Sequence, residues 1–203
     1  MPHFLGEREV NHCFPLNGCF ESPEVNGIQG IVETYRRNLQ EIQFAGPTFF
    51  SSILDIFMDF AVEGEELKNY FVLLIITDGN IHDMKETKEL IVQASKLPCS
   101  IIIVGVGNSD FDQMIDLDSD ENLLKDHKNQ FATRDIVQFV KFREAVARNN
   151  LAEELLKEIP SQVCRYMENI GFKPVPINSD MQKIEASVKK QLDMILKKKG
   201  VAL

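Results

Sequence analysis

The hydrophobic positions of this chain form two unbroken runs that are flanked by stripes at helical spacing. The runs are Phe71–Thr77 and Ser100–Gly105, and neither contains a charged residue. Strands covered on both faces of a parallel sheet read as continuous apolar runs, whereas half-buried strands alternate. We therefore predict that both runs form central strands of a parallel sheet.

Three stripes of apolar residues at helical spacing predict helices around these strands. The stripes lie within residues 28–39, 49–60 and 90–97, and each should face the core. Their members are Ile28, Ile31, Val32, Tyr35 and Leu39, then Phe49, Ile53, Ile56, Phe57 and Phe60, then Leu90, Ile91, Ala94 and Leu97. Because the third helix lies between the two runs, the three elements form a βαβ unit.

Weaker patterns complete the predicted order of elements. Val10–Phe14 reads as a short opening strand, Ile136–Val140 as a last strand and Leu151–Gly171 as one long helix. A final amphipathic helix is predicted over residues 180–199. The predicted fold class is α/β, with one domain over residues 1–176 and a basic C-terminal helix over residues 177–203.

Composition places the chain among globular domains. It has 203 residues, of which 44% are hydrophobic, and this size suits one domain with its own core. No run approaches the ~18 apolar residues of a membrane span, and the N-terminus lacks the apolar segment of a secretory signal. The four cysteines are scattered, which favours reduced thiols. We therefore expect a cytoplasmic protein.

Charge is distributed unevenly along the chain. The net charge of −9 at pH 7 argues against nucleic-acid binding, because that binding depends on basic surface. Residues 181–203 nevertheless carry six lysines against two acidic residues, so the tail is basic and the body acidic. The predicted C-terminal helix could lie on an anionic membrane, pair with another helix or fold back on the domain.

Asp78 and Thr48 are the candidate ligands of a metal ion. Asp78 follows the first apolar run, and ligands of open α/β sheets bind beyond the carboxyl ends of the strands. Thr48 follows Gly46-Pro47 in a predicted loop. Magnesium-type ions take oxygen ligands from few side chains and keep several waters, so one threonine and one aspartate can suffice. Alternatively, Asp78 only starts a turn and Thr48 only caps a helix.

Other chemical signals are weaker. The segment Asp116–Asp120 resembles the start of an EF-hand loop, but Glu121 replaces the required glycine and His127 the bidentate glutamate, so we predict a solvated acidic loop. The pair Gly105-Val-Gly107 lacks the third glycine of a dinucleotide loop. Because the sequence has no Gly-x-Ser-x-Gly elbow, Walker loop or His-Glu-x-x-His motif, we predict that it is not an enzyme.

Several strings taken together closely resemble the C-terminal domain of copines. They are Phe14–Gly18, Gly27-Ile28, Tyr35, Gly46–Thr48, Tyr70–Gly79, Ser100–Gly107, Phe111-Asp112, Leu117-Asp118, Arg134–Val140, Phe142-Arg143, Glu158–Pro160 and Tyr166-Met167. The likeness covers roughly residues 10–176. It implies a Rossmann-like domain of the von Willebrand A type, with a mostly parallel sheet between helices.

The resemblance also implies a function. In copines, two calcium-dependent phospholipid-binding modules precede a domain that binds partner proteins. Thr48 and Asp78 match the second and third elements of that domain's metal-ion-dependent adhesion site, where magnesium or manganese bridges to a partner's carboxylate. The implied function is an intracellular protein-interaction module, with peripheral plasma-membrane association in the full-length family. Calcium would belong to modules outside these residues.

The sequence departs from the family pattern upstream of position 10. The first metal-binding loop, of the type Asp-x-Thr-x-Ser, is not found there, and neither are the first strand and helix. We therefore expect a truncated product that binds metal weakly. We also expect an exposed apolar edge along residues 71–77, against which Val10–Phe14 could pair.

Two other functions stay open at this point. One is a metal-dependent hydrolase that uses Asp78 as a ligand and His82 or Asp83 in proton transfer. The other is a membrane-surface protein that acts through residues 180–199.

Overall fold

The structure, a computed structural model, describes residues 10–67, 69–118 and 122–173. The chain divides into two compact units, residues 1–166 and residues 167–203. The predicted C-terminal helix over residues 180–199 lies outside the described residues. The domain division at residue 176 therefore stays a prediction.

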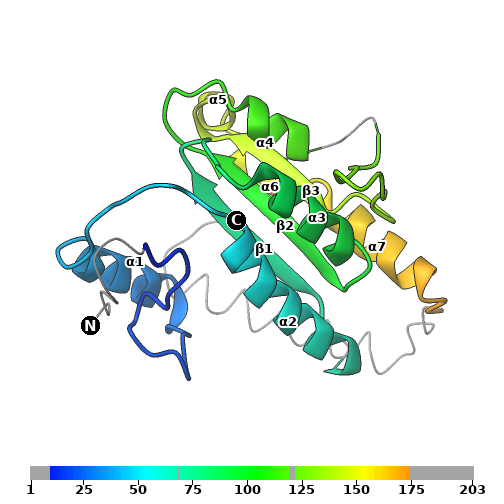
Figure 1. Cartoon of the computed structure of the whole chain (residues 1–203), viewed down its shortest axis with the longest axis horizontal. Helices are drawn as coiled ribbons and strands as arrows, with labels where there is room; N and C mark the ends of the chain where they lie inside the picture. Colours follow the sequence, from blue (N-terminus) through cyan, green and yellow to red (C-terminus); the bar gives the residue numbers. More distant parts are fainter. Residues whose placement is uncertain (1–9, 68, 119–121, 174–203) are drawn as a thin grey trace, which may run out of the picture. The chain divides into compact units, whose positions relative to one another are not determined.

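Three strands form one parallel sheet. They are β1 (Phe71–Thr77), β2 (Cys99–Gly105) and β3 (Val137–Lys141), and their order in the sheet is β1-β2-β3. The register places Thr77 opposite Gly105 and Gly105 opposite Lys141. The carboxyl ends of all three strands therefore lie at the same end of the sheet. Figure 1 shows the strands side by side. The predicted parallel arrangement of the two apolar runs and of the last strand is confirmed.

Seven helices are found among the described residues. They are α1 (Gly27–Asn38), α2 (Ser51–Leu67), α3 (Met84–Ala94), α4 (Asp112–Leu117), α5 (Phe142–Ala147), α6 (Leu151–Leu156) and α7 (Ile159–Asn169). Helix α3 connects β1 to β2, which confirms the predicted βαβ unit. Within the described part of the chain, no helix is both long and apolar enough for a membrane crossing.

The core lies between α2, α3 and one face of the sheet. Leu54 of α2, Ile91 of α3 and Ile101 and Ile103 of β2 are each at most 2% exposed. Leu73 and its alternate neighbours on β1 pack against this cluster. These contacts bury the apolar positions that recur with period two on the strands and at helical spacing on the helices.

Strand β1 lies at an edge of the sheet, so the prediction of a central strand is wrong. Val72, Leu74 and Ile76 are 46%, 55% and 66% exposed, whereas every residue of β2 is buried. A continuous apolar run shows which residues favour burial, but it does not provide a second strand with which β1 could pair. Among the described residues only β2 pairs with β1. The expected exposed apolar edge is confirmed, and Val10–Phe14 does not form the strand predicted for it.

Two predicted core stripes are also corrected. On α1 and its C-cap residue, Ile28, Ile31, Tyr35 and Leu39 are between 44% and 82% exposed. Amphipathic spacing marks a face suited to burial but does not provide a surface to cover it. On α2, the buried residues include Leu54, Phe57 and Ala61, whereas Ile56 and Phe60 are exposed.

Two predicted boundaries differ as well. The single helix predicted over residues 151–171 is two helices, α6 and α7. Pro160 stands in the first turn of α7, where its missing N–H is tolerated, although it would interrupt a longer helix. The predicted acidic loop is partly helical, since α4 spans Asp112–Leu117.

Candidate metal centre

The carboxyl ends of β1 and β2 are held close together by two glycines and one aromatic ring. The N–H of Val106 donates to the carbonyl oxygen of Thr77 at 2.8 Å. Gly79 has a φ of +106°, and a Cβ there would lie 2.6 Å from the Cδ1 atom of Phe111. A Cβ at Gly105 would lie 2.7 Å from the Cε1 atom of the same ring. A side chain at either position would have to displace the Phe111 ring, so both positions favour glycine.

Helix α4 fixes the same loop from one side. The N–H of Ile81 donates to the Oε1 atom of Gln113 at 3.0 Å, and the Nε2 atom of Gln113 donates to the carbonyl oxygen of Ile81 at 3.1 Å. One amide side chain therefore satisfies both backbone groups of a loop residue. The middle of the loop cannot shift without breaking both hydrogen bonds.

Asp83 joins this loop to the N-terminus of α2. Its carboxylate accepts hydrogen bonds from the N–H groups of Phe50 at 3.1 Å and Ser51 at 2.8 Å. It also accepts one from the hydroxyl of Thr87 at 3.3 Å. The first N–H groups of a helix have no partner within that helix, so a carboxylate at this place stabilises α2.

Burial and hydrogen bonding act on Asp83 in opposite directions. The side chain is 7% exposed, and burial raises the pKa of the carboxyl, but the hydrogen bonds from Ser51 and Phe50 outweigh burial and lower the pKa below its ordinary value. Asp83 is therefore ionised at neutral pH.

His82 brings Thr48 to the loop that begins at Asp78. The N–H of Thr48 donates to the Nδ1 atom of His82 at 3.1 Å, and the N–H of His82 donates to the carbonyl oxygen of Thr48 at 2.9 Å. Two segments more than thirty residues apart in the sequence are thus paired.

The two predicted ligands therefore come from adjacent loops, and both side chains are exposed. The hydroxyl of Thr48 and the carboxylate of Asp78 are oxygen donors, which suit a hard divalent cation. Among the described residues, no group of three or more histidine, cysteine, aspartate or glutamate side chains could hold a metal ion. An ion at this place would keep most of its waters. The assignment of Thr48 and Asp78 as ligands stays a prediction.

Two residues that hold the loops of Thr48 and Asp78 in position were not recognised as such from the sequence. Asp83 directly precedes α3, which is the pattern of a cap on that helix. Its carboxylate nevertheless accepts hydrogen bonds from the start of α2. Gln113 gives no local signal, because its partner Ile81 lies 32 residues away.

The amino end of the sheet holds a buried arginine. Arg134 is 2% exposed, and its Nη2 atom donates to the carbonyl oxygens of Leu97 at 2.6 Å and Cys99 at 2.7 Å. Its Nη1 atom donates to the hydroxyl of Tyr70 at 3.2 Å, and the guanidinium lies 5.5 Å from the centre of the Tyr166 ring. Burial raises the pKa of Tyr70. This cluster fastens α7 to the sheet.

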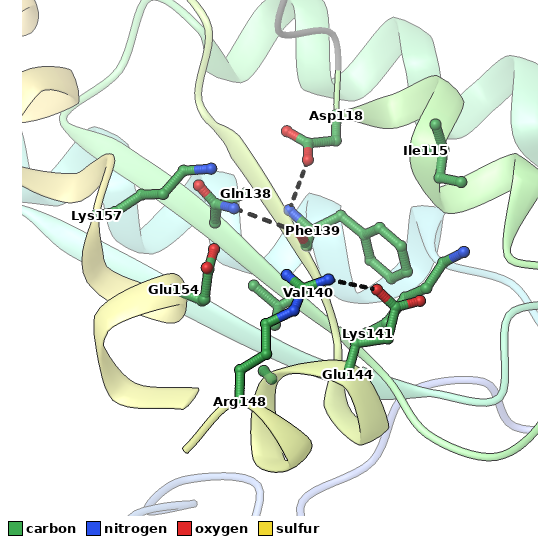
Figure 2. Close-up of a pocket in the computed structure, with 11 residues that line it drawn as sticks. Ile115, Asp118, Gln138, Phe139, Val140, Lys141, Glu144, Arg148, Glu154 and Lys157 are labelled. Carbon is green, nitrogen blue, oxygen red and sulfur yellow. Dashed lines mark hydrogen bonds and ion pairs between the residues drawn. The ribbon is translucent and has the colours of Figure 1, made fainter. Parts of the chain in front are cut away.

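A polar pocket of about 210 Å³ lies beside β3. Figure 2 shows its charged lining of Asp118, Lys141, Glu144, Arg148, Glu154 and Lys157. Part of this charge is paired within the lining, since Arg148 lies 3.3 Å from Glu144. The pocket thus presents both signs of charge.

The fold and the site define an α/β domain of the von Willebrand A type, in which a parallel sheet carries oxygen donors at its carboxyl end. The sequence matches the family model described as Copine over residues 3–175. The chain belongs to the copine family.

Curated relatives from three organisms support this assignment. The chain is 47% identical to Copine-C of Dictyostelium discoideum over 85% of its own length and 33% of that protein. It is 44% identical to Protein BONZAI 1 of Arabidopsis thaliana over 82% of its length and 30% of that protein. It is also 44% identical to Nicotinic receptor-associated protein 1 of Caenorhabditis briggsae, over 84% of its length and 29% of that protein. The chain therefore spans about a third of the length of these relatives.

Proposed function

We propose that this domain is a non-enzymatic module that captures partner proteins through a divalent cation at Thr48 and Asp78. The observation that carries the proposal is the pair of hydrogen bonds between Thr48 and His82, because they set two oxygen-bearing loops side by side. Mg²⁺ or Mn²⁺ suits these ligands, and a carboxylate of an intracellular partner would complete the coordination.

The relatives add context to this proposal. One of them is named as associated with a receptor, which is in keeping with a partner-binding role. We further propose a cytoplasmic location for proteins that carry this domain. Calcium-dependent phospholipid binding and association with the plasma membrane would belong to segments outside these 203 residues.

The geometry favours binding over hydrolysis. A hydrolase would need His82 or Asp83 free for proton transfer. The Nδ1 atom of His82 accepts a hydrogen bond from Thr48, and both carboxylate oxygens of Asp83 accept hydrogen bonds from the start of α2. These groups hold loops in place.

Titration with Mn²⁺, followed by electron paramagnetic resonance, tests the proposal. We expect weak saturable binding that Asp78→Asn and Thr48→Ala each abolish, because each removes an oxygen ligand. The matched control is Asp55→Asn, an exposed aspartate on α2, which should leave binding unchanged. Mn²⁺ binding that survives Asp78→Asn, or that Asp55→Asn weakens equally, would contradict the proposed site.

A further inference from the structure

The outer edge of β3 is closed by carboxylates. The N–H of Ile101 on β2 donates to the carbonyl oxygen of Ile136, so alternate residues from Val137 onward direct their backbone groups away from β2. The N–H of Val137 donates to Asp135 and the N–H of Phe139 donates to Asp118, each at 3.1 Å. Figure 2 shows the second of these bonds. Side chains thus occupy the donors to which another strand would bind.

The outer edge of β1 has no such protection among the described residues. The N–H of Phe71 donates to Pro98 and the carbonyl oxygen of Thr77 accepts from Val106, so these positions face β2. Their alternates, Val72, Leu74 and Ile76, therefore direct their N–H and C=O groups outward. No described residue forms a hydrogen bond with these outward groups.

The pattern of β1 is complementary to itself. If two copies pair antiparallel about a two-fold axis at Leu74, Val72 of one copy lies opposite Ile76 of the other. All three outward-facing residues then exchange N–H···O bonds with the second copy. The same three side chains are the exposed ones, at 46%, 55% and 66%, so the pairing also brings apolar surfaces together.

On the face of the sheet that packs against α2, apolar side chains are also exposed beside β1. Phe60 of α2 is 45% exposed, and its ring centre lies 6.3 Å from that of Phe71 on β1. Ile56, one helical turn earlier, is 44% exposed. An added strand would therefore meet apolar side chains on both of its faces, as a strand within a sheet does.

We propose that two copies of this chain associate through β1, so that two three-stranded sheets become one continuous sheet of six strands. A second copy is the occupant that fits, because the strand has no charge or proline between residues 71 and 77 and presents the same patch to its symmetry mate. Two copies with a net charge of −9 repel each other. Added salt should therefore strengthen the association.

Sedimentation velocity of the 203-residue chain over a range of concentrations tests the proposal. We expect a dimer whose fraction rises with concentration and with salt. Leu74→Lys should give a monomer, because it sets two lysines opposite each other at the axis. The matched control is Leu156→Lys on α6, where the leucine is 56% exposed, and it should leave the dimer intact.

A mixing experiment separates lost pairing from lost folding. Leu74→Lys and Leu74→Glu should each be monomeric, and their equimolar mixture should form a heterodimer, because opposite charges then face each other at the axis. Circular dichroism should give both variants the spectrum of the original chain. A monomer at every concentration, a dimer that survives Leu74→Lys, or a mixture that stays monomeric would overturn the proposal.

Discussion

The two ends of the parallel sheet are each organised by one buried ionisable side chain, but with different results. At the amino end, Arg134 donates to the backbone carbonyl oxygens of Leu97 and Cys99 at the start of β2. At the carboxyl end, Asp83 accepts from backbone N–H groups at the start of α2. Both groups satisfy backbone atoms from distant segments, so each determines how loops meet the sheet.

The difference lies in what surrounds these two groups. Around Arg134 the neighbours are aromatic rings and backbone carbonyl oxygens, and Arg134 and Tyr166 are buried. Near Asp83 the loops carry Thr48 and Asp78 with exposed oxygen atoms. The comparison teaches that a buried charge can hold a loop in place while side-chain oxygen atoms of that loop stay accessible.

Replacing Arg134 should have the largest effect. Arg134→Met should lower the free energy of unfolding by about 3 kcal/mol, because it leaves several buried carbonyl oxygens without a donor. Urea denaturation measures the change. The control is Arg143→Met, at an exposed arginine, which should stay within about 0.5 kcal/mol. Equal effects of the two variants would contradict a structural role for Arg134.

A smaller loss is expected at the carboxyl end. Gly79→Ala should cost about 2 kcal/mol, because it combines a positive φ with a Cβ only 2.6 Å from Phe111. Gly107→Ala is the matched control, since Gly107 has a φ of +102° but nothing within 4 Å of its Cβ position. The control should cost about 1 kcal/mol. Thermal unfolding compares the two, and a larger loss at Gly107 would show that Phe111 does not restrict the loop.

Asp83 gives the smallest of the three effects, and one that depends on pH. Asp83→Asn should lower the free energy of unfolding by about 1.5 kcal/mol at pH 7, as expected for loss of a charged helix cap. Because the pKa of Asp83 is lowered in the folded state, its contribution is present above the ordinary value of 3.8 and is lost as the pH falls through the folded value.

Urea denaturation of the original chain and of Asp83→Asn at several pH values measures this difference. The two stability curves should run parallel near neutral pH and converge in acid. A difference that stays constant down to the acid unfolding transition would mean that Asp83 does not titrate with the cap.

Much of the fold could be predicted from the sequence, because local periodicity reflects local geometry. The apolar runs at β1 and β2 and the stripe on α3 were placed within a few residues of their observed positions. The carboxyl-terminal position of Asp78 followed from the same pattern. The exposed edge at β1 followed from the family resemblance, whereas its period, taken alone, indicated a central strand.

The supporting residues of the candidate site could not be predicted in this way. Gln113 binds Ile81 across 32 residues, and Asp83 binds Phe50 across 33. Neither pair leaves a signal at short sequence separation. The orientation of α1 was mispredicted for a related reason, since its apolar stripe does not identify the surface that would cover it.

The amino-acid sequence by itself determined the strands β1 and β2, the helix α3 and the places of the oxygen donors along the chain, because side-chain periodicity and strand ends are local properties. Tertiary structure alone decided that Asp83 caps α2, that His82 holds Thr48, and that carboxylates occupy outward-facing N–H groups of β3. These outcomes depend on hydrogen bonds between segments that meet only after the chain has folded.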